Sequence, residues 1–304
     1  MLELRLLHHY TVSTGRTFSS AKEGVWTTLA PTIAFKNDFL MDAILAIAAQ
    51  DLSRTDETDK EAAEASERYF DSALRGHMQA LKLIDISQDV ASAVLITSAI
   101  VNVYSLALTA MVPTTEPDSV YSLMRWLRVA RGCRAVIDAR IPWHAGNEVM
   151  LAFLEADPDM RDGALLFAPE NRDKLQHLLD WGTEFETITE ADRDAYEQTL
   201  SFVGFTHMSV DSYKNNPLVT CRCVLVLPSR CPGRFVELVE EKRPRALVIL
   251  AHHFAALTLI KADYWWSRGV AERQIRLIYR LLPTAWKGMM EFPLQCISDF
   301  GRTT

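Results

Sequence analysis

The chain has 304 residues, 49% of them hydrophobic, so it is long enough to bury a sizeable core. Its formal net charge of -7 opposes the basic surface that phosphate binding requires, and we expect no direct contact between this chain and nucleic acid. Five scattered cysteines indicate reduced thiols in a cytoplasmic or nuclear protein rather than a disulfide framework. Since no linker-like tract interrupts the sequence, we predict one domain over residues 1–304.

Apolar residues recur at the three- and four-residue spacing of helices along almost the whole chain. The apolar, β-branched segment from Cys221 to Leu227 has prolines on either side and is too short to imply a sheet. We therefore predict an all-α fold, a single large helical domain with a buried central helix and an apolar pocket. The predicted helices cover residues 2–20, 37–54, 60–83, 89–111, 118–138, 146–155, 170–187, 190–211, 233–239, 243–264, 268–281 and 285–298.

The segment from Val90 to Val112 has no formal charge and meets the length criterion for a membrane span. Its content argues against lipid, because polar side chains are spread around the helix and no basic flank follows Pro113. A helix that is apolar on all sides is expected in the core of a large helical protein. We therefore predict no membrane span.

The first fifty residues carry an ordered series of motifs. Leu-Leu-His-His-Tyr at residues 6–10 is followed by Val25-Trp26, by Pro-Thr-Ile-Ala-Phe at 31–35 and by Phe-Leu-Met-Asp-Ala-Ile-Leu-Ala-Ile-Ala-Ala at 39–49. This order resembles the start of the effector domain in fungal zinc-cluster transcription factors, especially those of the sterol uptake control protein type. The resemblance implies a helical, ligand-binding effector domain.

Later motifs extend this resemblance over nearly the whole chain. Ala-His-His-Phe at residues 251–254 precedes Asp-Tyr-Trp-Trp at 263–266, and Leu282-Pro283 leads to Met-Glu-Phe-Pro at 290–293. The family commonly carries similar late elements. Its members also place a six-cysteine zinc cluster and a basic linker ahead of this domain, and the present sequence contains neither. We therefore expect the DNA-reading part to be missing from this chain.

Large adaptable side chains are abundant, with seven Trp, ten Met and thirteen Phe. The resemblance implies that the late helices help to build an apolar ligand pocket, and a few polar groups would orient the ligand there. Ordinary core packing is the alternative for each candidate. The predicted ligand-binding residues are Asn102, Tyr104, Ser105, Met111, Trp126, His252, Tyr264, Trp265, Trp266, Met289 and Met290.

The sequence gives little support for catalysis or metal binding. It contains no Gly-x-Ser-x-Gly, no glycine-rich phosphate loop and no His-Glu-x-x-His, so we expect no cofactor and leave the catalytic residues unassigned. Cys221, Cys223 and Cys231 lack a fourth ligand close in sequence, and we predict no metal site. Arginines 125, 128 and 131 lie on one helix face, where they would pair with acidic helices or bind an anionic ligand.

Three functions remain open. The first is a ligand-sensing effector domain that binds a sterol or terpenoid-like polycyclic molecule and acts in transcription regulation. The second is a stand-alone descendant whose pocket performs a cofactor-free cyclisation or isomerisation, such as a cycloaddition, in terpenoid or polyketide biosynthesis; such a reaction would need only shape, a few hydrogen bonds and exclusion of water. The third is a partner-binding module or homodimer with a solid core.

Overall fold

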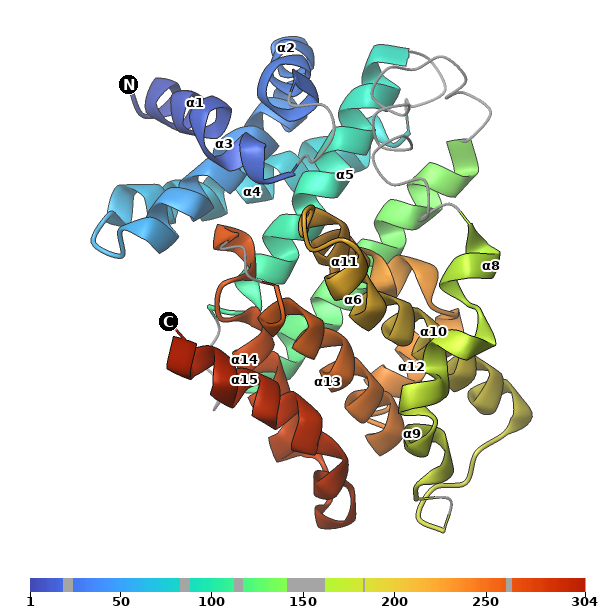
Figure 1. Cartoon of the computed structure of the whole chain (residues 1–304). Coiled ribbons are helices and arrows are strands. Elements are labelled where there is room, and N and C mark those ends of the chain that lie inside the picture. Colours follow the sequence, from blue (N-terminus) through green and yellow to red (C-terminus); the bar gives the residue numbers. More distant parts are fainter. Residues whose placement is uncertain are drawn as a thin grey trace. The chain divides into compact units, whose positions relative to one another are not determined.

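The computed structural model describes residues 1–18, 24–82, 88–111, 117–140, 162–182, 184–260 and 264–303. In these ranges the chain is built from helices and turns and contains no strand (Figure 1), which confirms the all-α prediction. The predicted helix at 146–155 lies outside the described residues. Backbone contacts divide the chain into two compact units. Unit 1 is Met1–Ser105, Gly132–Pro158 and Tyr264–Trp266, and unit 2 is Leu106–Arg131, Asp159–Asp263 and Ser267–Thr304.

Unit 1 is built around a helical hairpin. Helices α3 (Asp38–Thr55) and α4 (Lys60–Ala80) pack along their lengths, and α1 (Leu2–Val12) packs against α3 (Figure 1). The Asp59 side chain accepts a hydrogen bond from the Ala62 backbone N–H at 2.9 Å, which fixes the start of α4. The remaining elements before α3 are the 3-10 helix η1 (Thr14–Phe18), the π-helix η2 (Val25–Leu29) and α2 (Ala30–Ala34).

The first helix is shorter than predicted. It ends at Val12, because Ser13 leaves the helical region with φ of -128° and ψ of -76°. Thr14 then donates its hydroxyl to the Asp51 carboxylate at 2.7 Å, and the His9 ring nitrogen lies 2.8 Å from the same oxygen. The contacts of His9 and Thr14 with Asp51 thus hold this segment against α3, where the prediction had a continued helix.

Helices α5 (Gln88–Leu108) and α6 (Pro117–Arg140) contribute residues to both units. Among the described residues, Val90–Leu108 is the one helix long and apolar enough to cross a membrane, but 83% of that segment's most apolar window is buried inside the protein. Such burial is typical of a core helix, as the sequence predicts for this segment.

Unit 2 surrounds α13 (Pro244–Thr258), in which every residue from Arg245 to Leu257 is buried. Helices α10 (Glu190–Ser212) and α14 (Val270–Leu281) pack against it, as does α15 (Glu291–Thr303). The other elements are α8 (Gly163–Leu166), η5 (Pro169–Leu175), α9 (His177–Asp180), α11 (Leu218–Arg230), α12 (Gly233–Glu240), η6 (Trp265–Ser267, shared with unit 1) and η7 (Thr284–Met290).

Two segments of unit 2 differ from the prediction. The apolar segment from Cys221 to Leu227 is helical and lies within α11, so proline at its end did not prevent a helix. The continuous helix predicted at 170–187 is wrong, because the chain forms η5 and then the short α9. Gly182 follows with a positive φ of 73°, and a Cβ there would meet the Trp286 ring at 2.6 Å, so this turn requires glycine.

Candidate functional site

Buried polar atoms without a hydrogen-bond partner mark a candidate site. Such atoms are uncommon, because leaving one unpaired costs about 1–3 kcal/mol. Among the described residues eight side chains carry one, and six of these belong to unit 1. Those in unit 1 are on Tyr10, Gln50, Thr97, Ser105, Trp265 and Trp266, and those in unit 2 are on His253 and Gln274.

Gln50 joins α3 to α5. Its side-chain Nε2 donates to the Tyr104 backbone carbonyl at 3.4 Å, a long and weak bond, and the residue is only 1% exposed. A flipped amide would place its oxygen against that carbonyl oxygen, so the contact fixes the orientation of the amide. The unpaired atom is therefore Oε1, which accepts hydrogen bonds but cannot donate one.

Tyr104, a predicted ligand-binding residue, is held in the core of unit 1. Its ring stacks on Phe70 with centroids 3.8 Å apart. Its hydroxyl lies 2.9 Å from Ser66 Oγ, and Ser66 donates to the Ala46 carbonyl, so the Tyr104 hydroxyl donates to Ser66. This chain of contacts joins α3, α4 and α5 and orients the next residue along, Ser105, whose buried hydroxyl has no partner.

The other predicted residues of unit 1 are Asn102, which is half-buried on α5, and the three aromatic residues 264–266. Tyr264 stacks on Trp266 with centroids 5.9 Å apart. Trp265 and Trp266 are both buried, and the indole N–H of each lacks an acceptor. Unit 1 thus holds three predicted residues with unpaired polar atoms: Ser105, Trp265 and Trp266.

Five predicted residues belong to unit 2 instead. Trp126 is fully buried against Phe254, with ring centroids 5.7 Å apart, whereas Met111 is 46% exposed. Met290 is fully buried and Met289 is half-buried. The predicted set is therefore divided between the two units rather than gathered within one of them.

His252 of unit 2 is held in place by contacts with other residues of the protein. Burial lowers its pKa to about 3, so the imidazole is neutral at physiological pH, and Nδ1–H donates to the Val248 carbonyl at 3.0 Å. Its ring stacks on Phe292 at 5.7 Å, and its own backbone carbonyl accepts from His207 at 2.7 Å. These contacts account for both the burial and the orientation of the ring.

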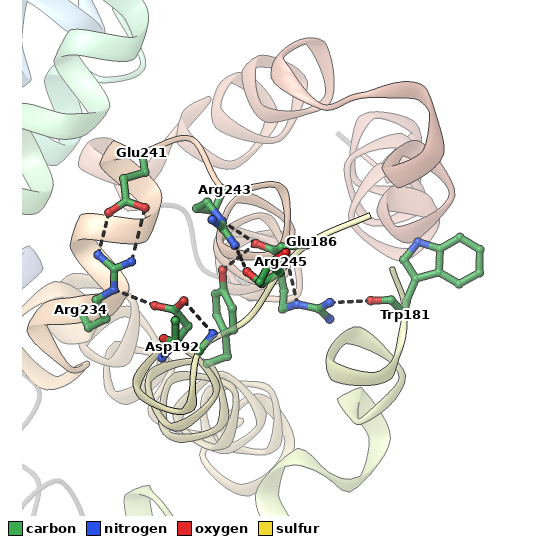
Figure 2. Close-up of polar contacts among 10 residues, drawn as sticks. Trp181, Glu186, Asp192, Arg234, Glu241, Arg243 and Arg245 are labelled. Atoms are coloured by element: carbon green, nitrogen blue, oxygen red, sulfur yellow. Dashed lines mark hydrogen bonds and ion pairs between the residues drawn. The ribbon is translucent and has the colours of Figure 1, made fainter. Parts of the chain in front are cut away.

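A buried polar network of unit 2 is centred on Arg245 (Figure 2). Arg245 is fully buried and donates to Glu186 at 3.1 Å, to the carbonyl of Leu179 at 2.8 Å and to that of Trp181 at 2.6 Å. Glu186 also accepts from Arg243 at 2.8 Å and from the Tyr196 hydroxyl at 3.0 Å. The guanidinium thereby satisfies carbonyl groups at the end of α9, and the network holds the fold together.

The arginine face predicted on residues 125, 128 and 131 lies on α6. Arg128 pairs with Glu240 of α12 at 2.7 Å, and this contact raises the pKa of the guanidinium. Arg131 donates to the Cys231 carbonyl at 3.4 Å. Pairing with an acidic helix, one of the two roles expected for this face, is therefore present at Arg128.

Sequence reasoning missed Gln50, Thr97 and Tyr10. Gln50 follows a run of alanine, isoleucine and leucine that is buried on all sides of α3. A polar amide at the end of such a run could have been recognised in the sequence as a candidate for a buried polar site. Tyr10 belongs to the Leu-Leu-His-His-Tyr motif, which served only to carry the family resemblance, and burial raises the pKa of its hydroxyl group. Spacing alone does not tell which of these polar atoms finds a partner inside the protein.

Comparison with known proteins finds similarity to fungal transcription factors. Residues 5–148 match the fungal specific transcription factor domain. A Zn(2)-C6 fungal-type transcription factor of Gibberella zeae is 26% identical over 97% of this chain, and the Zn(2)-C6 fungal-type transcription factor afumD of Aspergillus fumigatus is 28% identical over 83%. Sterol uptake control protein 2 of Candida albicans is 24% identical over 90% of this chain. The predicted resemblance is thus confirmed.

The chain spans only part of these relatives. It covers 61% of the Gibberella protein, 66% of the Aspergillus protein and 39% of the Candida protein. The matched residues include most of α1 and all of α2 to α6, and with them Tyr10, Gln50, Thr97 and Ser105, which carry unpaired polar atoms. The candidate site therefore lies largely in the part of the chain that the family match covers.

Proposed function

We propose that this chain, which carries the fungal specific transcription factor domain, is the ligand-sensing effector domain of a transcriptional regulator and acts in the nucleus. Its ligand is an apolar polycyclic molecule of the sterol or terpenoid class, held among the helices of unit 1. Binding would change the state of the regulator, since a ligand shifts a conformational equilibrium by its differential affinity for the two states.

The observation that carries this proposal is the group of unpaired polar atoms in unit 1. Gln50, Thr97 and Ser105 are buried among apolar helices, and each keeps an atom without a partner in the protein. An apolar ligand with a few polar groups would supply such partners while burying its own surface. Two relatives that carry the name sterol uptake control protein 2, from Candida albicans and Saccharomyces cerevisiae, support the choice of ligand class.

Direct detection of the ligand tests the proposal. Purified protein is incubated with a lipid extract from a fungus, separated from free lipid and examined by native mass spectrometry. The bound fraction is then extracted and identified by chromatography. We expect one sterol or terpenoid to be retained at about one molecule per chain and recovered unchanged, with a raised thermal midpoint that depends on ligand concentration.

The control is the variant Arg128→Gln, which changes an exposed ion pair of unit 2 and leaves the interior of unit 1 untouched. It should retain the same compound. Absence of any bound lipid in both proteins contradicts the proposal and favours a partner-binding module. Recovery of the compound as a new isomer contradicts the sensor function and favours the cofactor-free cyclase or isomerase.

A further inference from the structure

We infer that Trp181 and Phe185 of unit 2 form a docking surface for a partner protein that presents an apolar face bordered by lysine or arginine side chains. Trp181 is 41% exposed and Phe185 is 59% exposed, and the two residues lie on either side of one turn. This surface needs no small-molecule ligand, so it goes beyond the proposed function. It belongs to unit 2, whereas the unpaired polar atoms that carry the proposed function belong to unit 1.

The backbone that carries the two rings is held from inside the protein. Arg245 donates to the Trp181 carbonyl at 2.6 Å, and Figure 2 shows the Trp181 ring directed away from this contact. The backbone N–H of Phe185 donates to the Gly182 carbonyl at 3.0 Å and closes the turn. The next residue, Glu186, is buried and accepts from Arg245 at 3.1 Å. The same buried arginine therefore fixes the chain both before and after the turn.

An anchored turn with two exposed aromatic rings suits a binding surface. A single exposed aromatic residue is common on proteins, but here the fold orders the backbone of the turn and leaves both rings partly uncovered. Groups that are already ordered lose less conformational freedom when a partner binds. Tryptophan is among the residues that most often carry the binding energy of a protein interface. Trp181 and Phe185 are therefore placed to act as anchors in an apolar face of the partner.

The charges beside the rings select the partner. Asp180, Glu184 and Glu190 are exposed, and residues 180–190 contain no lysine or arginine. Among the described residues none of these three carboxylates forms an ion pair. Basic groups around an apolar face would complement the carboxylates and the rings together, and such complementarity favours the right partner over wrong ones. A membrane surface of anionic lipid would repel the carboxylates, so the arrangement favours a protein.

Binding of two defined peptides to the full chain tests this inference. The first is a fluorescently labelled helical peptide with leucines on one face and lysines around them, and the second has glutamates in place of the lysines. Their equilibrium affinities are measured by fluorescence anisotropy for the wild type and for Trp181→Ser, Phe185→Ser and Glu184→Lys. The controls Phe35→Ser and Glu64→Lys change an exposed ring and an exposed carboxylate of unit 1.

We expect the wild type to bind the lysine peptide and to bind the glutamate peptide about tenfold more weakly or less. Trp181→Ser and Phe185→Ser should each weaken binding of the lysine peptide about tenfold, because each removes an aromatic anchor. Glu184→Lys should weaken it about fivefold and reduce its dependence on salt. Both controls should stay within about twofold of the wild type, and all variants should keep its thermal midpoint. If Trp181→Ser fails to fold, Phe185→Ser decides, because its side chain is the more exposed.

Absence of binding in the wild type, or equal binding by the wild type, Trp181→Ser and Phe185→Ser, overturns the inference. Two further measurements test other occupants of the surface. A dimer that Trp181→Ser converts to a monomer in sedimentation equilibrium would assign the surface to a second copy of the chain. Flotation of the wild type, but not of Trp181→Ser, with vesicles of phosphatidylcholine and phosphatidylserine would assign it to a membrane. Either result overturns the inference, and none of these results changes the retention of a lipid by which the proposed function is tested.

Discussion

Unit 1 and unit 2 differ in what their buried polar side chains contact. In unit 2, the fully buried Arg245 donates to one carboxylate and to backbone carbonyls of the α9 region, and Glu186 accepts from three side chains (Figure 2). In unit 1, Gln50, Thr97 and Ser105 are also buried, yet each keeps an unpaired atom. Paired groups stabilise a fold and unpaired ones weaken it. The comparison therefore separates polar residues that serve folding from polar residues available for function.

The substitution Arg245→Met should have the largest effect on stability and therefore tests this comparison first. It leaves Glu186 buried with less positive charge beside it and removes the donors to the carbonyls of Leu179 and Trp181. Breaking a buried pair from one side costs about 3–5 kcal/mol. We expect the free energy of unfolding, measured by urea denaturation, to fall by about that amount, or the variant to be unfolded at 37 °C.

The matched control is Arg128→Gln, whose ion pair with Glu240 is exposed to solvent and should contribute little. Its denaturation midpoint should equal that of the wild type. If Arg245→Met were as stable as Arg128→Gln, the network in Figure 2 would not be a folding element, and the contrast between the two units would lose its basis.

Two glycines allow a test of packing, because they differ in the space available for a side chain. A Cβ on Gly204 in α10 would lie 1.9 Å from the Asn171 carbonyl oxygen, whereas a Cβ on Gly132 in α6 would meet nothing within 4 Å. Because the obstacle at Gly204 is backbone, we expect Gly204→Ala to lower the free energy of unfolding by about 3 kcal/mol. Gly132→Ala should raise it by about 0.5–1 kcal/mol, since alanine favours the helix. Thermal and urea denaturation of both variants measure the difference, and equal stability would contradict it.

How far the sequence predicts this protein depends on the kind of interaction. Helical periodicity predicts the all-α class and the long helices α3, α4, α10 and α13, because each has an apolar face or is apolar throughout. It fails between residues 169 and 182, where the turn at Gly182 depends on the Trp286 ring, a contact that is distant in sequence. Local patterns cannot report such a contact.

The candidate site shows the same limit. The sequence indicated Ser105, Trp265 and Trp266, but it gave no means to separate them from Tyr104, whose hydroxyl is paired with Ser66. Gln50 was missed because its importance depends on the carbonyl it contacts, which is 54 residues away. Residue type therefore predicted polar side chains in the core, and only the packing shows which of their atoms remain unpaired.

His253 is one of two exceptions among the described residues of unit 2, the other being Gln274, because its Nδ1 is buried and unpaired. Burial lowers the pKa of His253 to about 3, from about 6.5 in an unfolded chain. Below about pH 6.5 the unfolded chain binds a proton that the folded protein does not, so stability is fully present above that pH and falls as the pH decreases towards about 3. The wild type should lose stability between about pH 7 and pH 5.5, and His253→Gln should remove about 1 kcal/mol of that loss.

Urea denaturation of the two proteins across this pH range measures the effect. The comparison uses the change with pH and not the absolute stability, so a general weakening caused by the substitution does not affect the conclusion. Identical pH dependence in the wild type and His253→Gln would mean that the imidazole is protonated inside the folded protein. His253 would then have to find an acceptor for Nδ1–H, and it would no longer be an exception within unit 2.

The smallest expected effect gives the most direct comparison of the units. Thr97 and Thr220 are buried threonines at 0% and 1% exposure. The hydroxyl of Thr97 is unpaired, whereas that of Thr220 accepts from Ser209 at 2.8 Å. Threonine to valine keeps the shape of the side chain, so Thr220→Val should cost about 1 kcal/mol and Thr97→Val should be neutral or slightly stabilising. Urea denaturation of both variants, each compared with the wild type, measures this difference.

A loss of stability in Thr97→Val equal to that in Thr220→Val would show that the Thr97 hydroxyl has a partner when the protein is in water. A buried water molecule would be such a partner, and it would weaken the case that the polar atoms of unit 1 await a ligand. A neutral Thr97→Val has the opposite meaning. It would show that this hydroxyl contributes nothing to folding, so that its retention in the core of unit 1 requires a reason outside stability.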